Sequence, residues 1–192
     1  MEDRLQMTDF SAEAMKRKSA QNRRIILSEE VTRESMIKIE YWLDSLEKLD
    51  RMKGTKEPIT LVVDSFGGSI YSGLALIGRI EAMKDRGYKI ITEGFGVAMS
   101  MGFMLMICGS ERRSNRYTRY MLHQPSSMTW GTLEDMKMEV EEVEKLWIML
   151  KDLIKKYTKI TDHQLEELRK TKTDWFLSPQ ELQVLGGIDI IL

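Results

Sequence analysis

The chain has 192 residues, of which 42% are apolar and 31% are charged, and its formal net charge is −1. This length and composition are typical of one globular domain and exclude an intrinsically disordered chain. The balance of 29 basic and 30 acidic residues gives no reason to expect nucleic acid or an anionic membrane as a partner. No apolar run approaches the roughly 20 residues that span a bilayer, Cys108 is the single cysteine, and the first residues lack the pattern of a signal peptide. We therefore expect a cytoplasmic protein without an internal disulfide.

The first half of the sequence alternates short apolar runs with amphipathic stretches. Residues 1–22 are polar and mixed in charge, which predicts a mobile arm or a short helix. A strand is expected over 24–27, followed by a helix capped by Ser28 whose apolar residues recur near the helical period at Val31, Met36, Ile39, Leu43 and Leu46. After a polar loop over 51–57, we expect a buried strand over 59–63, a helix over about 70–86, a strand over 89–92 that ends near Gly94 and Gly96, and a short apolar helix over 100–108. This alternation predicts an α/β fold with crossover connections.

The second half contains one long amphipathic stretch. Between Thr132 and Tyr157, apolar residues recur at spacings that alternate between three and four, and charged residues fill most other positions. A helix over this range would be roughly 39 Å long. Its apolar stripe must be buried, either along the sheet of its own chain or on another subunit. Capping patterns predict two shorter helices further on, which begin after Thr161 and Ser178.

Ser100 stands where an expected strand gives way to an expected helix, in the segment Gly96-Val97-Ala98-Met99-Ser100-Met101-Gly102. A serine at such a turn is typical of a nucleophile elbow, because the turn exposes the hydroxyl and the helix N-terminus offers N–H groups to an oxyanion. The match to the G-x-S-x-G pattern is imperfect, since Ala98 occupies the first glycine position. Taken alone, the segment favours an ordinary helix-capping serine, which is a frequent arrangement.

His123 and His163 are the only histidines in the chain. A general base that works near neutral pH is most often a histidine. His123 follows an extended stretch and shortly precedes Pro125, where a strand gives way to a loop. A single histidine in such a loop is usually structural, and His163, in a polar helix start, is expected to be a solvated surface residue.

The segment Asp64-Ser65-Phe66-Gly67-Gly68 follows a strand that is expected to be buried. Two glycines there allow backbone N–H groups to point into a cleft. One such donor, together with the N–H of Met101 beside Ser100, would make an oxyanion hole. Taken alone, the segment is better explained as a plain strand-to-helix turn.

Together and in this order, these segments resemble the proteolytic-subunit (ClpP) family of the Clp proteases over roughly residues 22–192. Four segments carry the resemblance: the glycine loop 64–74, the serine segment 96–102, the histidine segment 121–125, and the C-terminal segment 174–182 with 187–189. Each segment alone is moderately specific, whereas four of them in the family's order are highly specific.

The resemblance implies a ClpP/crotonase-like spiral of ββα units with a projecting handle helix at about residues 132–157. It places this fold in a single peptidase domain over 23–192. The arm over 1–22 that precedes this domain could form an axial segment, but its sequence does not resemble the family's axial loops. It also implies stacked seven-membered rings around a closed chamber, with an AAA+ unfoldase as an ATP-dependent partner. It implies no metal and no cofactor.

For the chemistry, the resemblance implies a serine endopeptidase that cleaves unfolded polypeptides or peptides by acyl transfer. Ser100 would be the nucleophile, His123 the general base and Asp174 the residue that orients the base. The N–H groups of Gly68 and Met101 would form the oxyanion hole.

The sequence itself also distinguishes Asp174 from other aspartates. Asp152 lies within the long charged helix, where it belongs to a solvated face. Asp162 stands at a helix start, where the helix dipole explains an acidic residue. Asp174 has no such local explanation, and it precedes the apolar run Trp175-Phe176-Leu177, which could anchor its loop.

Several departures indicate a divergent member of the family. Phe66 stands where the family usually has proline, residues 126–131 contain one glycine where the family is glycine-rich, and Lys172 and Thr173 replace a usual Asp-Arg pair. Three alternatives remain open at this level: a viral-type capsid-maturation protease with the same chemistry, a non-catalytic ring subunit, and a crotonase-like acyl-CoA enzyme, which would not need Ser100 and His123.

Overall fold

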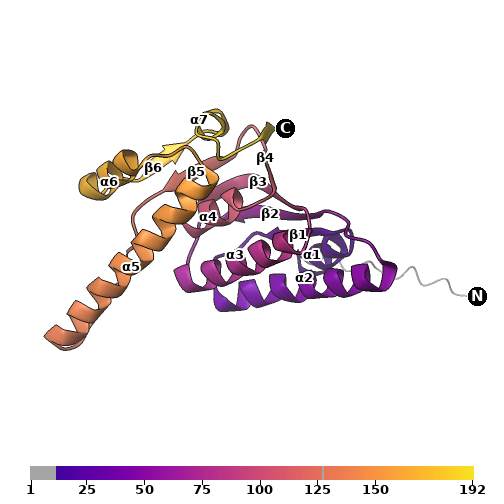
Figure 1. Cartoon of the computed structure of the whole chain (residues 1–192), viewed down its shortest axis with the longest axis horizontal. Coiled ribbons are helices and arrows are strands. Elements are labelled where there is room, and N and C mark those ends of the chain that lie inside the picture. The colour runs from indigo at the N-terminus through magenta and orange to yellow at the C-terminus, as the bar shows by residue number, and fades with distance from the viewer. Residues whose placement is uncertain (1–11, 127) are drawn as a thin grey trace, which may run out of the picture.

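The computed structural model describes residues 12–126 and 128–192, and it shows one sheet flanked by helices (Figure 1). In chain order the elements are α1 (Ala12–Gln21), β1 (Arg24–Leu27), α2 (Arg33–Lys53), β2 (Ile59–Ser65), α3 (Ile70–Asp85), β3 (Ile90–Met99), α4 (Met101–Ile107), β4 (Glu111–Ser114), β5 (Arg119–Leu122), α5 (Leu133–Tyr157), α6 (Asp162–Thr171), β6 (Trp175–Leu177), α7 (Pro179–Val184) and β7 (Ile190–Ile191). The predicted α/β class is confirmed.

Strand β3 is the branch point of the sheet. Its first part, residues 91–94, pairs in parallel with β2 on one side and with β4 on the other. Its last part, residues 97–99, pairs in parallel with β5, which in turn pairs antiparallel with β6. The sheet therefore divides along β3, in keeping with the predicted spiral of strands and helices.

The glycines of β3 serve this branching. A Cβ atom at Gly94 would lie 2.3 Å from the hydroxyl oxygen of Tyr120 on β5, so only glycine allows that close approach. Gly96 has a φ of 73°, and a Cβ atom there would lie 2.3 Å from Oδ1 of Asp64. The sequence predicted that the strand ends near these glycines, and that was wrong, because β3 continues through them to Met99.

Helix α4 lies in the centre of the core. All seven of its residues are buried, and it contacts α3, α5, β2 and β3. Such complete burial explains why its sequence is apolar all round rather than amphipathic. Because the helix is fixed on every side, the residue that precedes it, Ser100, has a well-defined position.

Helix α2 differs from its predicted bounds at both ends. It begins at Arg33 with Thr32 as the N-cap, whereas Ser28 was predicted as the cap. Val31 is extended because it forms a β-bridge with Gly68. The helix continues to Lys53, within the predicted polar loop, and ends at Gly54, whose φ of 67° closes it.

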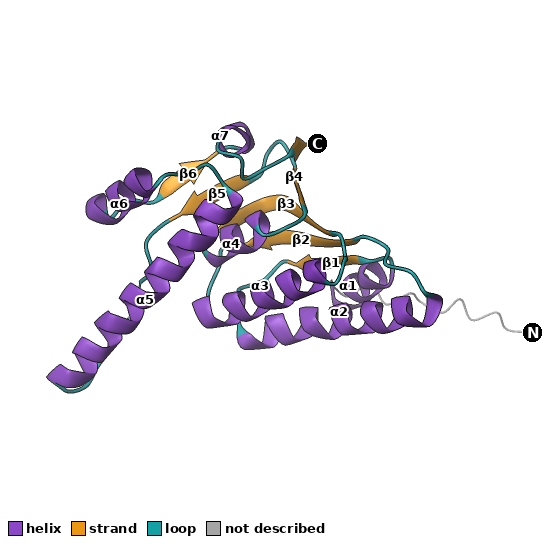
Figure 2. Cartoon of the chain, in the orientation of Figure 1, coloured by secondary structure: helices purple, strands orange, loops and turns teal. Residues whose placement is uncertain are grey.

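Helix α5 confirms the predicted long helix, with Thr132 as its N-cap. Only its C-terminal half is packed in this chain, through Leu146, Trp147, Leu150 and Ile154. Figure 2 shows its N-terminal half reaching beyond the rest of the chain, while α2 and α3 lie side by side on the sheet. The apolar residues of that half are exposed, with Leu133 at 67% and Val140 at 62%.

The remaining elements follow the sequence closely. The part of the predicted N-terminal arm that the structure describes forms helix α1, and residues 1–11 of that arm lie outside the described residues. Helices α6 and α7 begin at the predicted caps, Thr161 and Ser178. Among the described residues, no helix has the length and apolar character needed to cross a membrane.

Candidate active site

Ser100 lies between the end of β3 and the start of α4 in an unusual backbone conformation. Its φ is 51° and its ψ is −120°, a region that non-glycine residues rarely occupy. Its N–H donates to the carbonyl oxygen of Met121 at 2.9 Å, which holds the turn in place. Its side chain makes no capping hydrogen bond with α4. The hydroxyl is therefore free for another partner, and the capping role that the segment alone favoured does not apply.

Strand pairing brings His123 next to this hydroxyl. Strands β3 and β5 are parallel, with Met99 opposite Met121, so the residues after the two strands emerge at the same edge of the sheet. His123 Nε2 lies 2.8 Å from Ser100 Oγ. This distance is a normal hydrogen bond, and it joins a hydroxyl to the base that could remove its proton.

Asp174 lies on the other side of the imidazole. Strand β6 pairs antiparallel with β5, with Leu122 opposite Trp175, so the residue before β6 faces the residue after β5. Asp174 Oδ1 lies 3.9 Å from His123 Nδ1, an ion-pair distance rather than a hydrogen bond. The two side chains are 52% and 30% exposed respectively. The structure thus brings the three side chains together, with His123 between Ser100 and Asp174.

The glycine loop packs directly against Ser100. A Cβ atom on Gly67 would lie 2.7 Å from Ser100 Cβ and 3.0 Å from the nitrogen of Met101. Gly68 has a φ of 141°, and a Cβ atom there would lie 2.4 Å from the carbonyl oxygen of Val31. Both positions therefore require glycine, for their backbone conformation and for the close approach.

Two backbone N–H groups in this region lack an internal acceptor. In the Val31–Gly68 bridge, Val31 N–H donates to Gly67 and Ser69 N–H donates to Val31, so Gly68 N–H takes no part. Met101 is the first residue of α4, where a helix has no acceptor for its N–H. Within residues 12–126 and 128–192, neither N–H donates a hydrogen bond.

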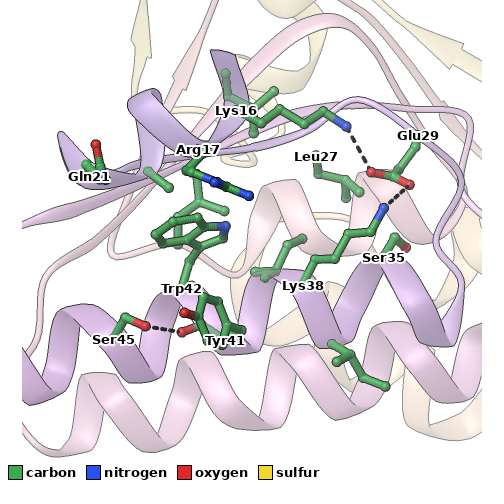
Figure 3. A pocket seen from close by; sticks show the side chains of 15 residues that line it. Lys16, Arg17, Gln21, Leu27, Glu29, Ser35, Lys38, Tyr41, Trp42 and Ser45 are labelled. Atoms are coloured by element: carbon green, nitrogen blue, oxygen red, sulfur yellow. Dashed lines mark hydrogen bonds and ion pairs between the residues drawn. The ribbon is translucent and has the colours of Figure 1, made fainter. Parts of the chain in front are cut away.

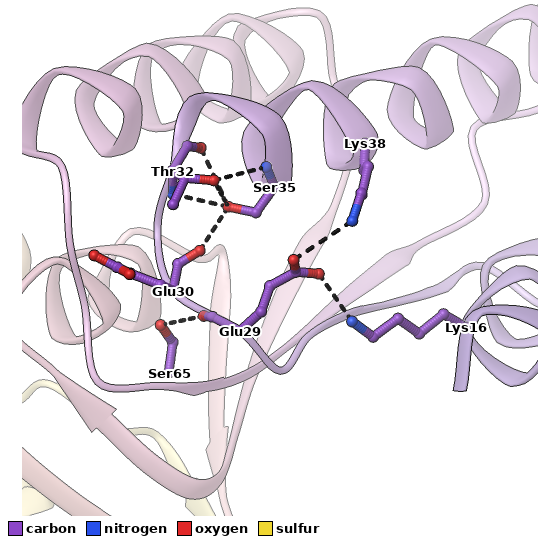
Figure 4. Close-up of polar contacts among 7 residues, drawn as sticks. All are labelled: Lys16, Glu29, Glu30, Thr32, Ser35, Lys38 and Ser65. Atoms are coloured by element: carbon purple, nitrogen blue, oxygen red, sulfur yellow. Dashed lines mark hydrogen bonds and ion pairs between the residues drawn. The ribbon is translucent and has the colours of Figure 1, made fainter. Parts of the chain in front are cut away.

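The loop before α2 contacts Ser65, which lies just before the glycine loop, as Figure 4 shows. Ser65 Oγ donates to the carbonyl oxygen of Glu29 at 2.7 Å and accepts from Gly67 N–H at 3.1 Å. The Glu29 carboxylate accepts from Lys16 at 2.9 Å and from Lys38 at 3.5 Å. The hydrogen bond from Lys16 is the largest cause that holds the pKa of Glu29 below its usual range.

These supporting residues were missed in the sequence. Ser65 is part of the glycine segment, but its role depends on the approach of Glu29, which lies 36 residues earlier in the chain. A polar residue two positions before paired glycines is the only local signal, and it does not identify a partner.

A small apolar pocket opens beside Ser100 and His123. Its volume is about 20 Å³, and Ile70, Met104, Leu122 and Trp147 are among the residues that line it. The pocket lies between α3, α4 and α5, and its volume has room for about one water molecule.

A much larger cavity lies elsewhere, between α1, β1 and α2 (Figure 3). It has a volume of about 910 Å³, and the residues Lys16, Glu29 and Lys38 form ion pairs at one end. Neither Ser100 nor His123 lines it. Size alone would favour this cavity, but the hydroxyl, imidazole and carboxylate chemistry is at the small pocket.

His163 is exposed on α6, as predicted. Within the described ranges, no group of three or more His, Cys, Asp or Glu side chains is arranged to hold a metal ion.

Comparison with known proteins agrees with this geometry. Residues 8–192 match the sequence model of the family described as Clp protease. The chain is 32% identical to an ATP-dependent Clp protease proteolytic subunit 1 of Prochlorococcus marinus subsp. pastoris, over 88% of this chain and 82% of that protein. It is 32% identical to a proteolytic subunit of Deinococcus radiodurans over 71% of this chain and 66% of that protein, and 31% identical to a proteolytic subunit 2 of Synechococcus over 88% and 82%. The resemblance found in the sequence is confirmed, and this chain belongs to the Clp protease family.

Proposed function

We propose that this chain is a serine endopeptidase in which Ser100, His123 and Asp174 form the catalytic triad. The observation that carries the proposal is the 2.8 Å contact between Ser100 Oγ and His123 Nε2, made by a serine whose φ is 51° and whose side chain makes no capping hydrogen bond. Family membership supports peptide-bond hydrolysis as the reaction.

The reaction follows from the positions of the side chains. His123 Nε2 takes the Ser100 hydroxyl proton as Oγ attacks the peptide carbonyl carbon. The N–H groups of Gly68 and Met101 donate to the oxyanion that forms. His123 then gives the proton to the leaving amine, and an acyl-enzyme remains on Ser100. Water, activated by the same imidazole, attacks the ester and releases the second product.

Asp174 has a positioning role in this scheme. Its carboxylate faces Nδ1 of His123, so it favours the tautomer that carries its proton on Nδ1 and leaves Nε2 free to accept. It also stabilises the imidazolium that forms during the attack.

The alternatives are less well supported. A non-catalytic ring subunit would be expected to lack one of the three side chains, and all three are present in one row. A crotonase-like acyl-CoA enzyme has no need of the Ser100–His123 pair. A capsid-maturation protease would use the same chemistry, so it differs in substrate and not in the site.

The assembly is part of the proposal. We expect the exposed N-terminal half of α5 to be the handle that buries its apolar residues in a second ring, giving stacked heptameric rings around a chamber. Such a chamber would admit unfolded polypeptides, and the names of the relatives support an ATP-dependent unfoldase as the partner. A cytoplasmic location would fit this partner.

The test is turnover of fluorogenic peptides by the 192-residue protein and three variants. Ser100→Ala and His123→Ala are expected to lose turnover by at least about 10³-fold, since both act in the same step. Ser45→Ala, which removes a hydroxyl that bonds only to its own helix at Tyr41, is the matched control and should be unaffected. Full activity in Ser100→Ala would show that another residue is the nucleophile.

A further inference from the structure

The cavity between α1, β1 and α2 takes no part in the proposed reaction (Figure 3). Its volume of about 910 Å³ is within the range of cavities that enclose a bound group. Its floor is apolar, because α2 contributes Ile37, Tyr41 and Trp42 and β1 contributes Ile26. Ile37 and Tyr41 are one helical turn apart on the same face of α2, and they are 55% and 64% exposed. An occupant that covers this floor must carry apolar side chains.

One end of the cavity is positively charged. Of the described residues that line it, three are cationic, namely Lys16, Arg17 and Lys38, and only Glu29 is acidic. Lys16 and Lys38 share the Glu29 carboxylate, at 2.9 and 3.5 Å. A single carboxylate balances only one of three positive charges. The occupant of this end should therefore be acidic as well as apolar.

Residues 1–11, which lie outside the described residues, are attached to the wall of this cavity. They join α1 at Ala12, and Lys16 follows one turn later, about 6 Å along the helix axis. The α2 wall extends from Ser35 to Ser45, over about 15 Å. Ten residues of extended chain reach about 33 Å. The segment is therefore long enough to reverse direction at the start of α1 and follow the whole cavity.

The sequence of this segment matches the lining. Three of its first ten residues are acidic and one is basic. Asp3, Leu5, Met7 and Asp9 occupy alternate positions, and alternate side chains of an extended segment face the same side. One side of such a segment thus combines apolar and acidic groups, as the apolar floor and the cationic end require.

We infer that residues 1–10 of this chain lie in the cavity between α1, β1 and α2 and close it. Leu5 and Met7 cover the apolar floor, and Asp9, which is nearest to α1, faces Lys16. A second copy of the chain is a weaker candidate, because a segment tethered to the cavity wall has a high effective concentration there. The inference goes beyond the proposed function and does not depend on the peptidase chemistry.

Disulfide trapping tests the position of the segment. Cys108 is buried, and burial raises the pKa of its thiol to about 12, so only introduced cysteines will react. In the double variant Met7→Cys/Tyr41→Cys, one cysteine is in the segment and the other is in the cavity floor. Met7→Cys/Tyr117→Cys is the matched control, since Tyr117 is also an exposed tyrosine but lies outside the cavity.

Under a mild oxidant, we expect the bond within one chain to form at least about tenfold faster in the Tyr41 variant than in the Tyr117 variant, because the thiols are held together. Intact mass under non-reducing conditions distinguishes this bond from one between chains. Equal rates in the two variants, or bonds only between chains, would overturn the inference.

Deletion of residues 2–9 provides a second test, with the fluorescent anion 8-anilinonaphthalene-1-sulfonate as the probe. The dye is aromatic and negatively charged, so it suits the opened cavity, and its fluorescence should be higher with the shortened protein than with the natural one. Ile37→Asp in the shortened protein should remove this increase, because it places a carboxylate in the apolar floor. Circular dichroism establishes that each variant keeps its fold.

Two results of the dye measurement would contradict the inference. If deletion causes no increase, the cavity is either open in the natural protein or covered by another chain, and residues 1–10 do not close it. If the increase persists in Ile37→Asp, deletion has exposed a different surface.

Discussion

Asp174 is the most exposed member of the proposed triad and makes its longest contact, at 3.9 Å from His123 Nδ1. We expect Asp174→Asn to lower kcat by up to about 10⁴-fold, because the amide favours the wrong imidazole tautomer and cannot stabilise the imidazolium. The measurement is kcat for a fluorogenic peptide, with circular dichroism to establish that the fold is kept.

Asp162→Asn is the control for this substitution. Asp162 pairs with Lys155 at the surface, and a surface pair contributes little. Its kcat should therefore stay near that of the natural protein. If kcat collapsed in Asp162→Asn and stayed near normal in Asp174→Asn, Asp174 would not be the residue that orients His123.

Gly68 is the proposed oxyanion donor of the glycine loop, and its backbone conformation also requires glycine. A methyl group there would lie 2.4 Å from Val31 O, so Gly68→Ala must displace the bridge that positions the N–H. Loss of one oxyanion donor lowers kcat by about 10²–10³-fold, and we expect a loss of this size with KM less affected.

Gly78 on α3 is the matched control for Gly68, since a Cβ atom there meets nothing within 4 Å. Gly78→Ala should leave kcat unchanged and stabilise the fold slightly, because alanine favours a helix. If the two alanine variants had equal kcat, Gly68 would not be a donor of the oxyanion hole.

The segments that carry the site could be predicted from the sequence, but their mutual positions could not. Ser100, His123 and Asp174 were found as motif residues. Their proximity depends on the pairing of β5 with both β3 and β6, which is set by long-range register and leaves no local signal. The contact between Ser65 and Glu29 was missed for the same reason.

At the scale of the elements, tertiary contacts explain the errors in predicted bounds. Ser28 is a good capping residue, but the bridge between Val31 and Gly68 holds the chain extended until Thr32. Gly94 and Gly96 were predicted to lie near the end of a strand. In the structure they lie within β3, where the absence of a side chain allows Tyr120 and Asp64 to approach the strand closely. Helix starts set by local capping, at Thr132, Thr161 and Ser178, were predicted correctly.

Arg112 on β4 joins the C-terminal end of α5 to the last strand. Its guanidinium donates to the carbonyl oxygens of Tyr157 and Gly186 and, through Nη2 and Nε, to the carboxylate of Asp189 at 2.6 and 3.0 Å. The hydrogen bond from the Arg112 side chain is the largest cause that lowers the pKa of Asp189. A lowered pKa in the folded state means that this stabilisation is present above the unfolded pKa of about 3.9 and is lost as pH falls through the folded value.

We therefore expect Asp189→Asn to lower Tm by about 2–5 °C at pH 7, with allowance for the partial exposure of the pair. The difference from the natural protein should shrink as pH falls below about 4, because the carboxylate is then protonated in the unfolded chain and, at lower pH, in the folded chain as well. Thermal melts at pH 7 and pH 3 measure it, with exposed Asp152→Asn as the control. A Tm difference that stays constant over this range would mean that the Arg112 pair does not cause it.

At the scale of the whole molecule, we expect a partner to cover the projecting end of α5. Its apolar residues are exposed in the single chain, and exposed apolar patches often mark association surfaces. We expect the protein to sediment as two stacked seven-membered rings of the 22.4 kDa chain. Val140→Glu, which places a charge in this face, should shift the particle toward single rings.

Analytical ultracentrifugation at micromolar concentration measures this shift. Glu141→Gln, at the neighbouring exposed position, is the control and should sediment like the natural protein. A natural protein that remains a stable monomer would rule out both the handle and the chamber.

The most direct test of the central claim is intact-mass spectrometry of the full-length protein after reaction with a serine-directed fluorophosphonate. We predict one adduct per chain, located at Ser100 by peptide mapping, with no adduct in Ser100→Ala and a much slower reaction in His123→Ala. An adduct that persists in Ser100→Ala, or a natural protein that does not react, would contradict the assignment of Ser100 as the nucleophile.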